Sequence, residues 1–179
     1  LRAARRDVAD PEIETIRLRT AAQAAWRTVD TGGATLTVRT GGTVRADPTQ
    51  LQTLFENLFR NAIEHTDGDV AVTVGLLQRD GDSAGTTGTN GATRGFFVAD
   101  DGPGIPPVER DDVFERGHSG DDGTGLGLAI VEEVATAHGW EISVGEGPDG
   151  GACFEIVDVE VEVDDEVSTD DEESASEGD

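Results

Sequence analysis

Apolar residues recur at the spacing of an α-helix in three stretches of the chain. The middle stretch follows Asp47 and Pro48, a pair typical of a helix start, because aspartate caps free N–H groups and proline suits the first helical position. The last stretch ends before Gly139, and glycine is common just after a helix. We therefore predict three helices, over residues 11–28, 48–65 and 123–138. The apolar face of the second consists of Leu51, Leu54, Phe55, Leu58, Ala62 and Ile63.

Shorter stretches carry strand patterns. Residues 34–40 and 43–47 alternate apolar and polar positions around Gly41 and Gly42, which predicts either a hairpin or a pair of short strands. Further strands are predicted at residues 69–78, 95–100, 140–145 and 151–162. This order of helices and strands predicts an α+β fold, a two-layer sandwich in which about three helices cover one face of one mixed sheet.

Composition excludes several functions. The 179 residues include 38 acidic and 13 basic ones, for a net charge of −25, and every basic residue is arginine. Without lysine there is no P-loop lysine and no Schiff-base amine. The negative charge also argues against nucleic acid or anionic membrane as a partner. A lysine-free acidic surface resembles proteins of salt-loving archaea, although a GC-rich genome that replaces lysine with arginine is the alternative.

The two ends of the chain differ from its body. Residues 158–179 hold 12 acidic residues and no basic one, so we expect a disordered acidic tail there. Residues 1–10 are interpreted as a linker or as the end of an upstream helix, which leaves a single domain at 11–157. The sequence has no methionine even at position 1, so we expect a piece of a longer protein. Its single cysteine, Cys153, excludes a disulfide framework and is expected in the core.

Three motifs carry candidate chemistry, and the first is a pair of asparagines. Asn57 and Asn61 lie four residues apart on the predicted second helix, so both should point from one exposed ridge. Amide oxygens can serve as ligands for a hard cation such as Mg²⁺, which keeps several waters when it is bound to phosphates. The alternative is that both amides are ordinary solvated surface.

The second motif, residues 100–105, directly follows a predicted strand and reads DDGPGI. A carboxylate at a strand end, such as that of Asp100, can accept a hydrogen bond from the exocyclic amine of adenine. Gly102 and Gly104 would let the backbone approach a flat ring closely. An ordinary turn of the same composition is the alternative.

The third motif, GTGLGL at residues 123–128, opens the last predicted helix. Free N–H groups and the helix dipole make such a glycine-rich helix start a site for anions. It does not match the dinucleotide fingerprint, because the third glycine of that pattern would fall on Leu128.

In this order and within about 70 residues, the three motifs resemble the ATP-binding domain of histidine kinases, part of the gyrase, Hsp90, histidine kinase and MutL superfamily. NLFRNAIEHT is similar to the N box of that family, VADDGPGIP to its G1 box, VFERGHS to its F box and GTGLGLAIVEEVATAHGWEISV to its G2 box. The resemblance covers residues 11–157, and the wording is most similar to haloarchaeal sensor kinases. It implies a Bergerat-type fold that binds ATP and Mg²⁺.

The resemblance also implies a role for each matching residue. Asn61 would bind Mg²⁺, with Asn57 in support, and Asp100 would hold the adenine amine. A lid over the nucleotide would span residues 105–122. The full implied ATP site comprises Asn57, Asn61, His65, Asp100, Gly102, Gly104, Ile105, Arg116, Gly123, Thr124, Gly125, Leu126 and Gly127.

The implied activity is transfer of the ATP γ-phosphoryl group to a histidine on a separate dimerisation domain, for relay to a response regulator in the cytoplasm. ATP hydrolases of the superfamily carry a glutamate base where this chain has Asn57, and an amide is a poor base. None of His65, His118 and His138 has the acid-flanked helical setting of an acceptor, so the acceptor is expected outside this chain. The alternatives are a serine kinase of the anti-sigma type with the same fold, or a degenerate nucleotide-binding scaffold.

Overall fold

The computed structural model describes residues 10–39, 41–66, 68–77, 95–115 and 127–163. Its elements, in chain order, are β1 (Glu14–Arg17), α1 (Leu18–Trp26), β2 (Thr35–Val38), β3 (Gly42–Ala46), α2 (Pro48–Glu64), β4 (Ala71–Leu77), β5 (Gly95–Asp100), α3 (Gly127–His138), β6 (Glu141–Glu146), β7 (Ala152–Val157) and β8 (Val161–Val163).

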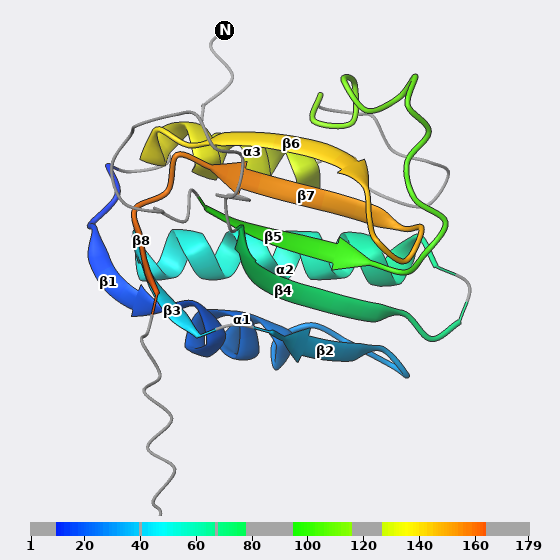
Figure 1. The fold of residues 1–179 in the computed structure, drawn as a ribbon, viewed down its shortest axis with the longest axis horizontal. Coiled ribbons are helices and arrows are strands. Elements are labelled where there is room, and N and C mark those ends of the chain that lie inside the picture. Colours follow the sequence, from blue (N-terminus) through cyan, green and yellow to red (C-terminus); the bar gives the residue numbers. More distant parts are fainter. Residues whose placement is uncertain (1–9, 40, 67, 78–94, 116–126, 164–179) are drawn as a thin grey trace, which may run out of the picture.

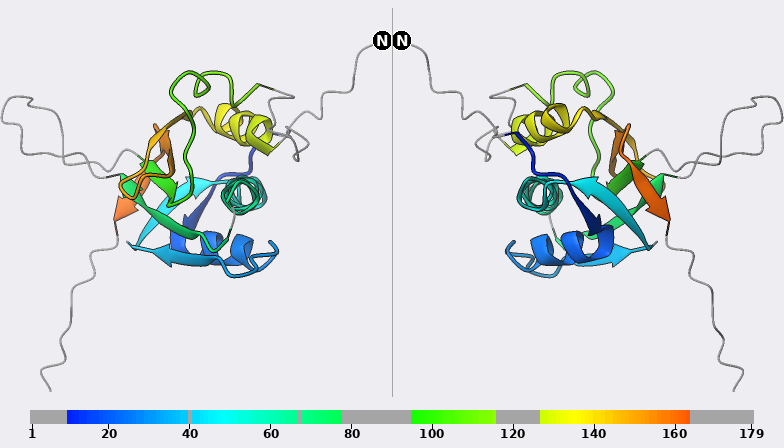
Figure 2. Two further views of the ribbon diagram at one scale, coloured as in Figure 1. Left: turned by 90° about the vertical axis from the view of Figure 1, so that its right-hand side faces the viewer. Right: turned by 90° about the vertical axis from the view of Figure 1, so that its left-hand side faces the viewer.

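Five strands form the main sheet, in the order β2-β4-β5-β7-β6. β2 runs parallel to β4, and the other neighbours are antiparallel, so the sheet is mixed. All three helices lie against one face of this sheet, as the end-on views show (Figure 2). The predicted two-layer α+β sandwich is therefore confirmed.

The core fills the space between these two layers. Phe55 and Phe59 on α2 are fully buried, and the Phe55 ring lies 5.5 Å from that of Phe96 on β5. The rings of Trp26, at the end of α1, and Phe59 pack edge to face, with their centroids 5.2 Å apart. Burial of apolar surface is the dominant favourable term in folding, and aromatic side chains bury the largest area each. The helix that carries the asparagines is thus fixed between the sheet and α1.

A second sheet, of three strands in the order β1-β3-β8, was not predicted. It lies at one end of the molecule (Figure 1, left). Residues 14–17, which were assigned to the first helix, pair instead with β3, with Ile16 opposite Val44. The chain is helical only from Leu18 onward, where α1 begins. Tertiary pairing of four residues here overrides a weak local pattern.

The predicted hairpin over residues 34–47 is wrong, and its alternative, a pair of short strands, is confirmed. β2 joins the main sheet beside β4, whereas β3 joins the small sheet between β1 and β8. Gly42 is needed at this crossing, because a Cβ there would lie 2.6 Å from a methyl carbon of Leu76.

The start of α2 and the end of α3 lie where the capping residues in the sequence predict them. The Asp47 Oδ1 accepts a 3.0 Å hydrogen bond from the Gln50 N–H at the start of α2, and Gly139, at φ +76°, follows α3. His138 joins the two ends, because its Nε2 accepts a 3.0 Å bond from the Asp47 N–H.

The folded body extends beyond the predicted boundary at residue 157. Val159 is buried and β8 pairs with β3, so the first residues of the expected acidic tail belong to the domain. The predicted linker, apart from Asp10, and the rest of the tail lie outside the described residues. In the described part of the chain, no helix is both long and apolar enough to cross a membrane.

Candidate functional site

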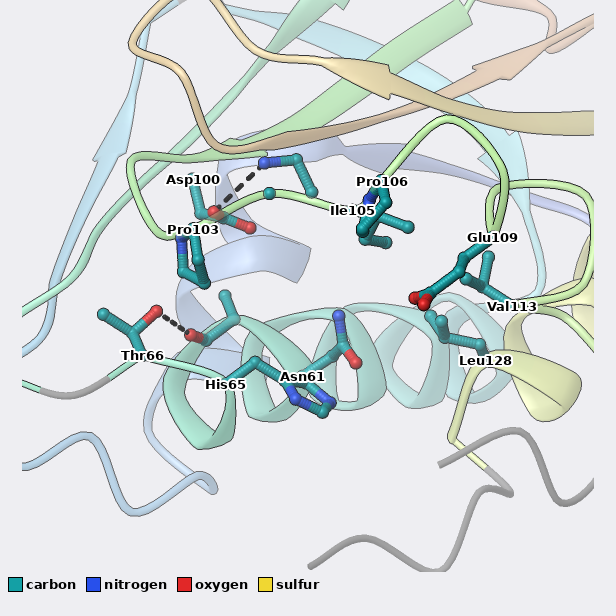
Figure 3. Close-up of a pocket in the computed structure, with 13 residues that line it drawn as sticks. Asn61, His65, Thr66, Asp100, Pro103, Ile105, Pro106, Glu109, Val113 and Leu128 are labelled. Atoms are coloured by element: carbon teal, nitrogen blue, oxygen red, sulfur yellow. Dashed lines mark hydrogen bonds between the residues drawn. The ribbon is translucent and has the colours of Figure 1, made fainter. Parts of the chain in front are cut away.

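A cavity of about 220 Å³ lies between the second half of α2 and the segment that follows β5 (Figure 3). Four separate parts of the chain meet there: the end of α2, residues 100–113, the start of α3, and Ala152 at the start of β7. The lining residues are Asn61, Ala62, His65, Thr66, Asp100, Pro103, Gly104, Ile105, Pro106, Glu109, Val113, Leu128 and Ala152. Residues as far apart in the sequence as Asn61 and Ala152 thus share one cavity.

Asp100 ends β5 with its carboxylate held in place at one end of the cavity. Its Oδ1 accepts hydrogen bonds from the N–H of Gly102 at 2.9 Å and of Ala152 at 3.2 Å. Burial raises the pKa of Asp100 above its ordinary value, although these two N–H donors and the nearby His65 oppose that shift. The carboxylate therefore has one oxygen fixed by the backbone and one left to accept a hydrogen bond from a ligand.

The glycines around Asp100 are required by close approaches. A Cβ on Gly102 would lie 2.6 Å from the Thr66 Oγ1, and Gly104 has φ +75° beside the carbonyl of Gly150. Gly151, which sequence reasoning did not single out, faces the backbone and carboxylate of Asp100 so closely that no side chain fits. Motif spacing could not reveal it, because Gly151 lies about 50 residues further along the chain.

Asn61 and His65 reach the cavity from α2, one turn apart. Asn61 is half-buried, and His65 is exposed at the C-terminus of the helix. Figure 3 shows the Asn61 amide pointing toward the segment after β5, whereas the His65 ring extends along the helix. Asn61 and Asp100, the two residues expected at opposite ends of one ligand, therefore line a single cavity.

Asn57 does not lie on an exposed ridge with Asn61, so that prediction is wrong. Its side chain is buried, its Nδ2 donates a 2.7 Å bond to the Thr53 carbonyl, and a Cβ on Gly127 would lie 3.4 Å from its Oδ1. Packing of α3 on α2 covers this position. Asn57 is absent from the cavity lining and lies beneath the start of α3.

Glu56, the acidic neighbour of Asn57, points away from the cavity. Its Oε1 accepts hydrogen bonds from the Thr28 hydroxyl at 2.7 Å and from the Gln52 Nε2 at 2.8 Å. Thr28 follows the end of α1 and Gln52 lies one turn earlier on α2, and neither lines the cavity, as expected for a side chain turned by about 100° around the helix from Asn57. Glu56 cannot replace Asn57 as a base in the cavity.

Several lining residues were not among the site residues predicted from the sequence. Thr66 donates a 2.8 Å hydrogen bond from its hydroxyl to the Ala62 carbonyl, and the buried Val113 and the half-buried Leu128 form an apolar wall. Glu109 adds a second carboxylate. Glu109 and Val113 lie within the predicted lid over residues 105–122, although that prediction gave neither residue a role of its own.

The remaining predicted site residues are placed as follows. Ile105 lines the cavity, and Gly127 is the first residue of α3, although it is not part of the lining. Arg116, Gly123, Thr124, Gly125 and Leu126 lie outside the described residues, as does the second part of the predicted lid.

The known proteins that are similar to this chain include sensor histidine kinases. Residues 46–163 match the family described as "Histidine kinase-, DNA gyrase B-, and HSP90-like ATPase". The chain is 46% identical over 66 residues to the sensor histidine kinase TmoS of Ectopseudomonas mendocina, which is 33% of this chain and 7% of TmoS. It is 34% identical over 116 residues to the signal transduction histidine-protein kinase AfsQ2 of Streptomyces coelicolor, which is 62% of this chain and 19% of AfsQ2.

Solved structures agree with this match. The mycobacterial sensor histidine kinase MprB superposes with a TM-score of 0.64 at 28% identity, over 80% of this chain and 96% of that structure. The curated relatives are much longer proteins, of which this chain spans only a small part.

Proposed function

Because the chain belongs to the family of histidine kinase-, DNA gyrase B- and HSP90-like ATPases, we propose that it is the ATP-binding catalytic domain of a sensor histidine kinase. One observation carries the proposal: Asp100 and Asn61, from two different elements, line the same cavity. The relatives named above are themselves sensor histidine kinases.

The end of the cavity at Asp100 suits the adenine base. The free carboxylate oxygen can accept a hydrogen bond from the exocyclic amine, and guanine, which has a carbonyl there, would be repelled. Ile105 and Pro103 add apolar surface for the ring. Half-burial of Asp100 strengthens this discrimination against guanine. A carboxylate oxygen that is removed from water and receives no hydrogen bond from the base costs binding free energy.

The residues on α2 suit the phosphates and a divalent cation. Asn61 presents a neutral amide to the cavity, and oxygen ligands of this kind fit Mg²⁺, which would neutralise charge on the triphosphate when bound. His65 lies one turn further along α2 and can donate a hydrogen bond to phosphate oxygens. We retain Arg116 and the glycine-rich segment 123–127 as proposed phosphate contacts.

Phosphoryl transfer, not rapid hydrolysis, is the proposed reaction. Asn57 occupies the place of the glutamate base in the superfamily's ATP hydrolases, and it is buried with its amide bonded to its own helix. Glu56 points toward α1. Transfer depends on positioning and on charge neutralisation more than on a strong base in the protein.

The partners follow from this reaction. The proposed acceptor is a histidine on a dimerisation domain, in the same polypeptide or in a dimer partner, and the next acceptor is a response regulator. We also propose a cytoplasmic location and, from the net charge of −25 without lysine, a protein adapted to high salt of the haloarchaeal kind.

Labelled ATP tests the proposal directly. The domain is incubated at high salt with Mg²⁺ and a separately supplied histidine-bearing dimerisation domain, and the product is checked for acid lability. We expect acid-labile phosphohistidine with the wild-type domain and a loss of at least tenfold with Asn61→Ala. Transfer that survives Asn61→Ala would refute the assigned site, and an acid-stable product would favour the serine kinase instead.

A further inference from the structure

Glu109 brings a second carboxylate into the cavity, away from Asp100. It belongs to the segment that follows β5, and it lines the same cavity as Asn61. In Figure 3 its carboxylate oxygens point into the cavity toward α2, from which Asn61 projects, while Asp100 lies at the other end. The cavity therefore has one carboxylate at its base-binding end and another facing the proposed cation ligand.

The position of Glu109 is fixed by its backbone. Its N–H donates a 2.9 Å hydrogen bond to the Pro106 carbonyl, and its own carbonyl accepts bonds from the N–H groups of Asp112 and Val113 at 3.0 and 3.1 Å. Val113 is buried against the cavity wall. These bonds fix the backbone from which the exposed Glu109 side chain extends into the cavity.

The charges in the cavity make this placement informative. Among the described lining residues, His65 is the one basic side chain and none is arginine, and the sequence contains no lysine. The neighbouring Arg110 does not line the cavity, and its Nε donates a 3.0 Å bond to the Ile105 carbonyl. A triphosphate beside Glu109 would be repelled, unless a divalent cation lay between the two.

We propose that Glu109 is, together with Asn61, a protein ligand of the divalent cation that accompanies the nucleotide. Mg²⁺ bound with a nucleotide commonly takes one or two protein oxygens, and phosphates and waters fill its remaining positions. One neutral amide and one carboxylate meet that requirement. The inference rests on the proposed function, since the cation arrives with ATP.

Calorimetric titration of ATP at high salt, with Mg²⁺ and with EDTA, tests the proposal on wild type, on Glu109→Gln and on the control Asp111→Asn. Asp111 is exposed on the same segment and does not line the cavity. We expect Glu109→Gln to bind Mg·ATP about tenfold more weakly. Metal-free ATP should bind this variant as well as wild type or better, because a repulsive charge is gone, and adenosine and the control should show no change.

A thiol in place of the carboxylate gives a second, sharper readout. Glu109→Cys should bind Cd·ATP more tightly than Mg·ATP relative to wild type, because thiolates prefer soft cations. Cys153 is the only natural cysteine in the sequence. It cannot compete for the cation, because it is buried and burial raises its pKa to about 11.

Each other outcome overturns the inference. Tighter binding of Mg·ATP by Glu109→Gln would make Glu109 a purely repulsive charge, and unchanged binding would make it a bystander. Slower ATP hydrolysis at unchanged affinity would make it a general base. A wild-type domain that binds no Mg·ATP would overturn the proposed function itself, and the inference with it, so the two failures are distinguishable.

Discussion

Asp100 is the residue on which recognition of the base depends. Replacement by asparagine keeps an oxygen for the Gly102 and Ala152 N–H groups but places an NH₂ group where the free carboxylate oxygen was. The asparagine NH₂ group and the adenine amine, both hydrogen-bond donors, would then face each other. We expect Asp100→Asn to weaken ATP binding by roughly 10- to 100-fold, as for a lost hydrogen bond to a charged group. Calorimetry measures this, with the exposed neighbour Asp101→Asn as the control for charge.

The same substitution should not destabilise the fold at neutral pH. The pKa of Asp100 is raised, chiefly by burial, so the folded state binds the proton more readily than the unfolded chain does. Its ionised form therefore costs stability above that pKa, and the cost disappears as the pH falls through it. Urea unfolding should show Asp100→Asn at least as stable as wild type at pH 7, with the gap closing toward acid. A less stable variant at pH 7 would contradict this account.

Gly151 tests the packing around that carboxylate. Any Cβ here would overlap the backbone and side chain of Asp100, so Gly151→Ala should lower the free energy of unfolding by about 1–3 kcal/mol. Gly145→Ala, in the adjacent strand β6, is the matched control, because its Cβ would meet nothing within 4 Å. Thermal unfolding measures the midpoints of the two variants. Equal midpoints would show that the segment before β7 shifts to accommodate the added methyl group without loss of stability.

At the scale of residues, local motifs predicted the site only in part. Asp100, Asn61 and His65 could be identified because each belongs to a short pattern, and the structure brings all three to one cavity. Gly151 could not, because only the pairing of β5 with β7 brings it near. Glu109 lay within the predicted lid over residues 105–122, but the sequence did not single it out there. Burial of Asn57 depends on how α3 packs on α2, which a single helix does not reveal.

Among the elements, α2 is held at its start by a network that also reaches α3. The two Asp47 carboxylate oxygens accept bonds from the N–H groups of Gln50 and Glu12, while the His138 Nε2 accepts from the Asp47 N–H. Because α2 carries Asn61 and His65, this network sets the position of the cavity's helical wall. Loss of the cap should loosen the site as well as the helix.

Asp47→Ala should therefore cost about 1 kcal/mol of stability at neutral pH, the usual value of a helix cap. Slight burial works to raise the pKa of Asp47, but backbone N–H donors and His138 outweigh it and lower that pKa below the ordinary value. A lowered pKa means that this stabilisation is present at neutral pH and is lost as the pH falls through the folded pKa. Urea unfolding of wild type, Asp47→Ala and the cap-preserving Asp47→Asn measures it. An equal loss in both variants would show that the cap's hydrogen bonds are not the source.

Elements with strong end signals were predicted better than those defined by pairing. α2 and β5 have the expected bounds within a residue or two. An aspartate cap followed by proline marks the start of α2 locally, and a continuous apolar run marks β5. β1 was hidden inside a predicted helix, because four residues with one inward-facing isoleucine look the same in either structure until β3 is beside them. The separation of β2 and β3 into two sheets is likewise a property of long-range partners.

At the scale of the whole molecule, the charge of −25 on 179 residues dominates behaviour in solution. Carboxylates crowded on one surface repel each other, and the repulsion destabilises the compact state more than the expanded one. The Debye length falls from about 10 Å at 0.1 M salt to about 3 Å at 1 M, so salt removes most of this repulsion. Stability should thus depend on salt far more than in a protein of balanced charge.

We expect the thermal midpoint of the domain to rise steadily as KCl increases from 0.1 to 2 M. The control is the same series near the sequence isoelectric point of about 4.1, where carboxylates are partly protonated and the net charge is close to zero, so the rise should be much smaller. A midpoint independent of KCl at pH 7 would reject adaptation to salt.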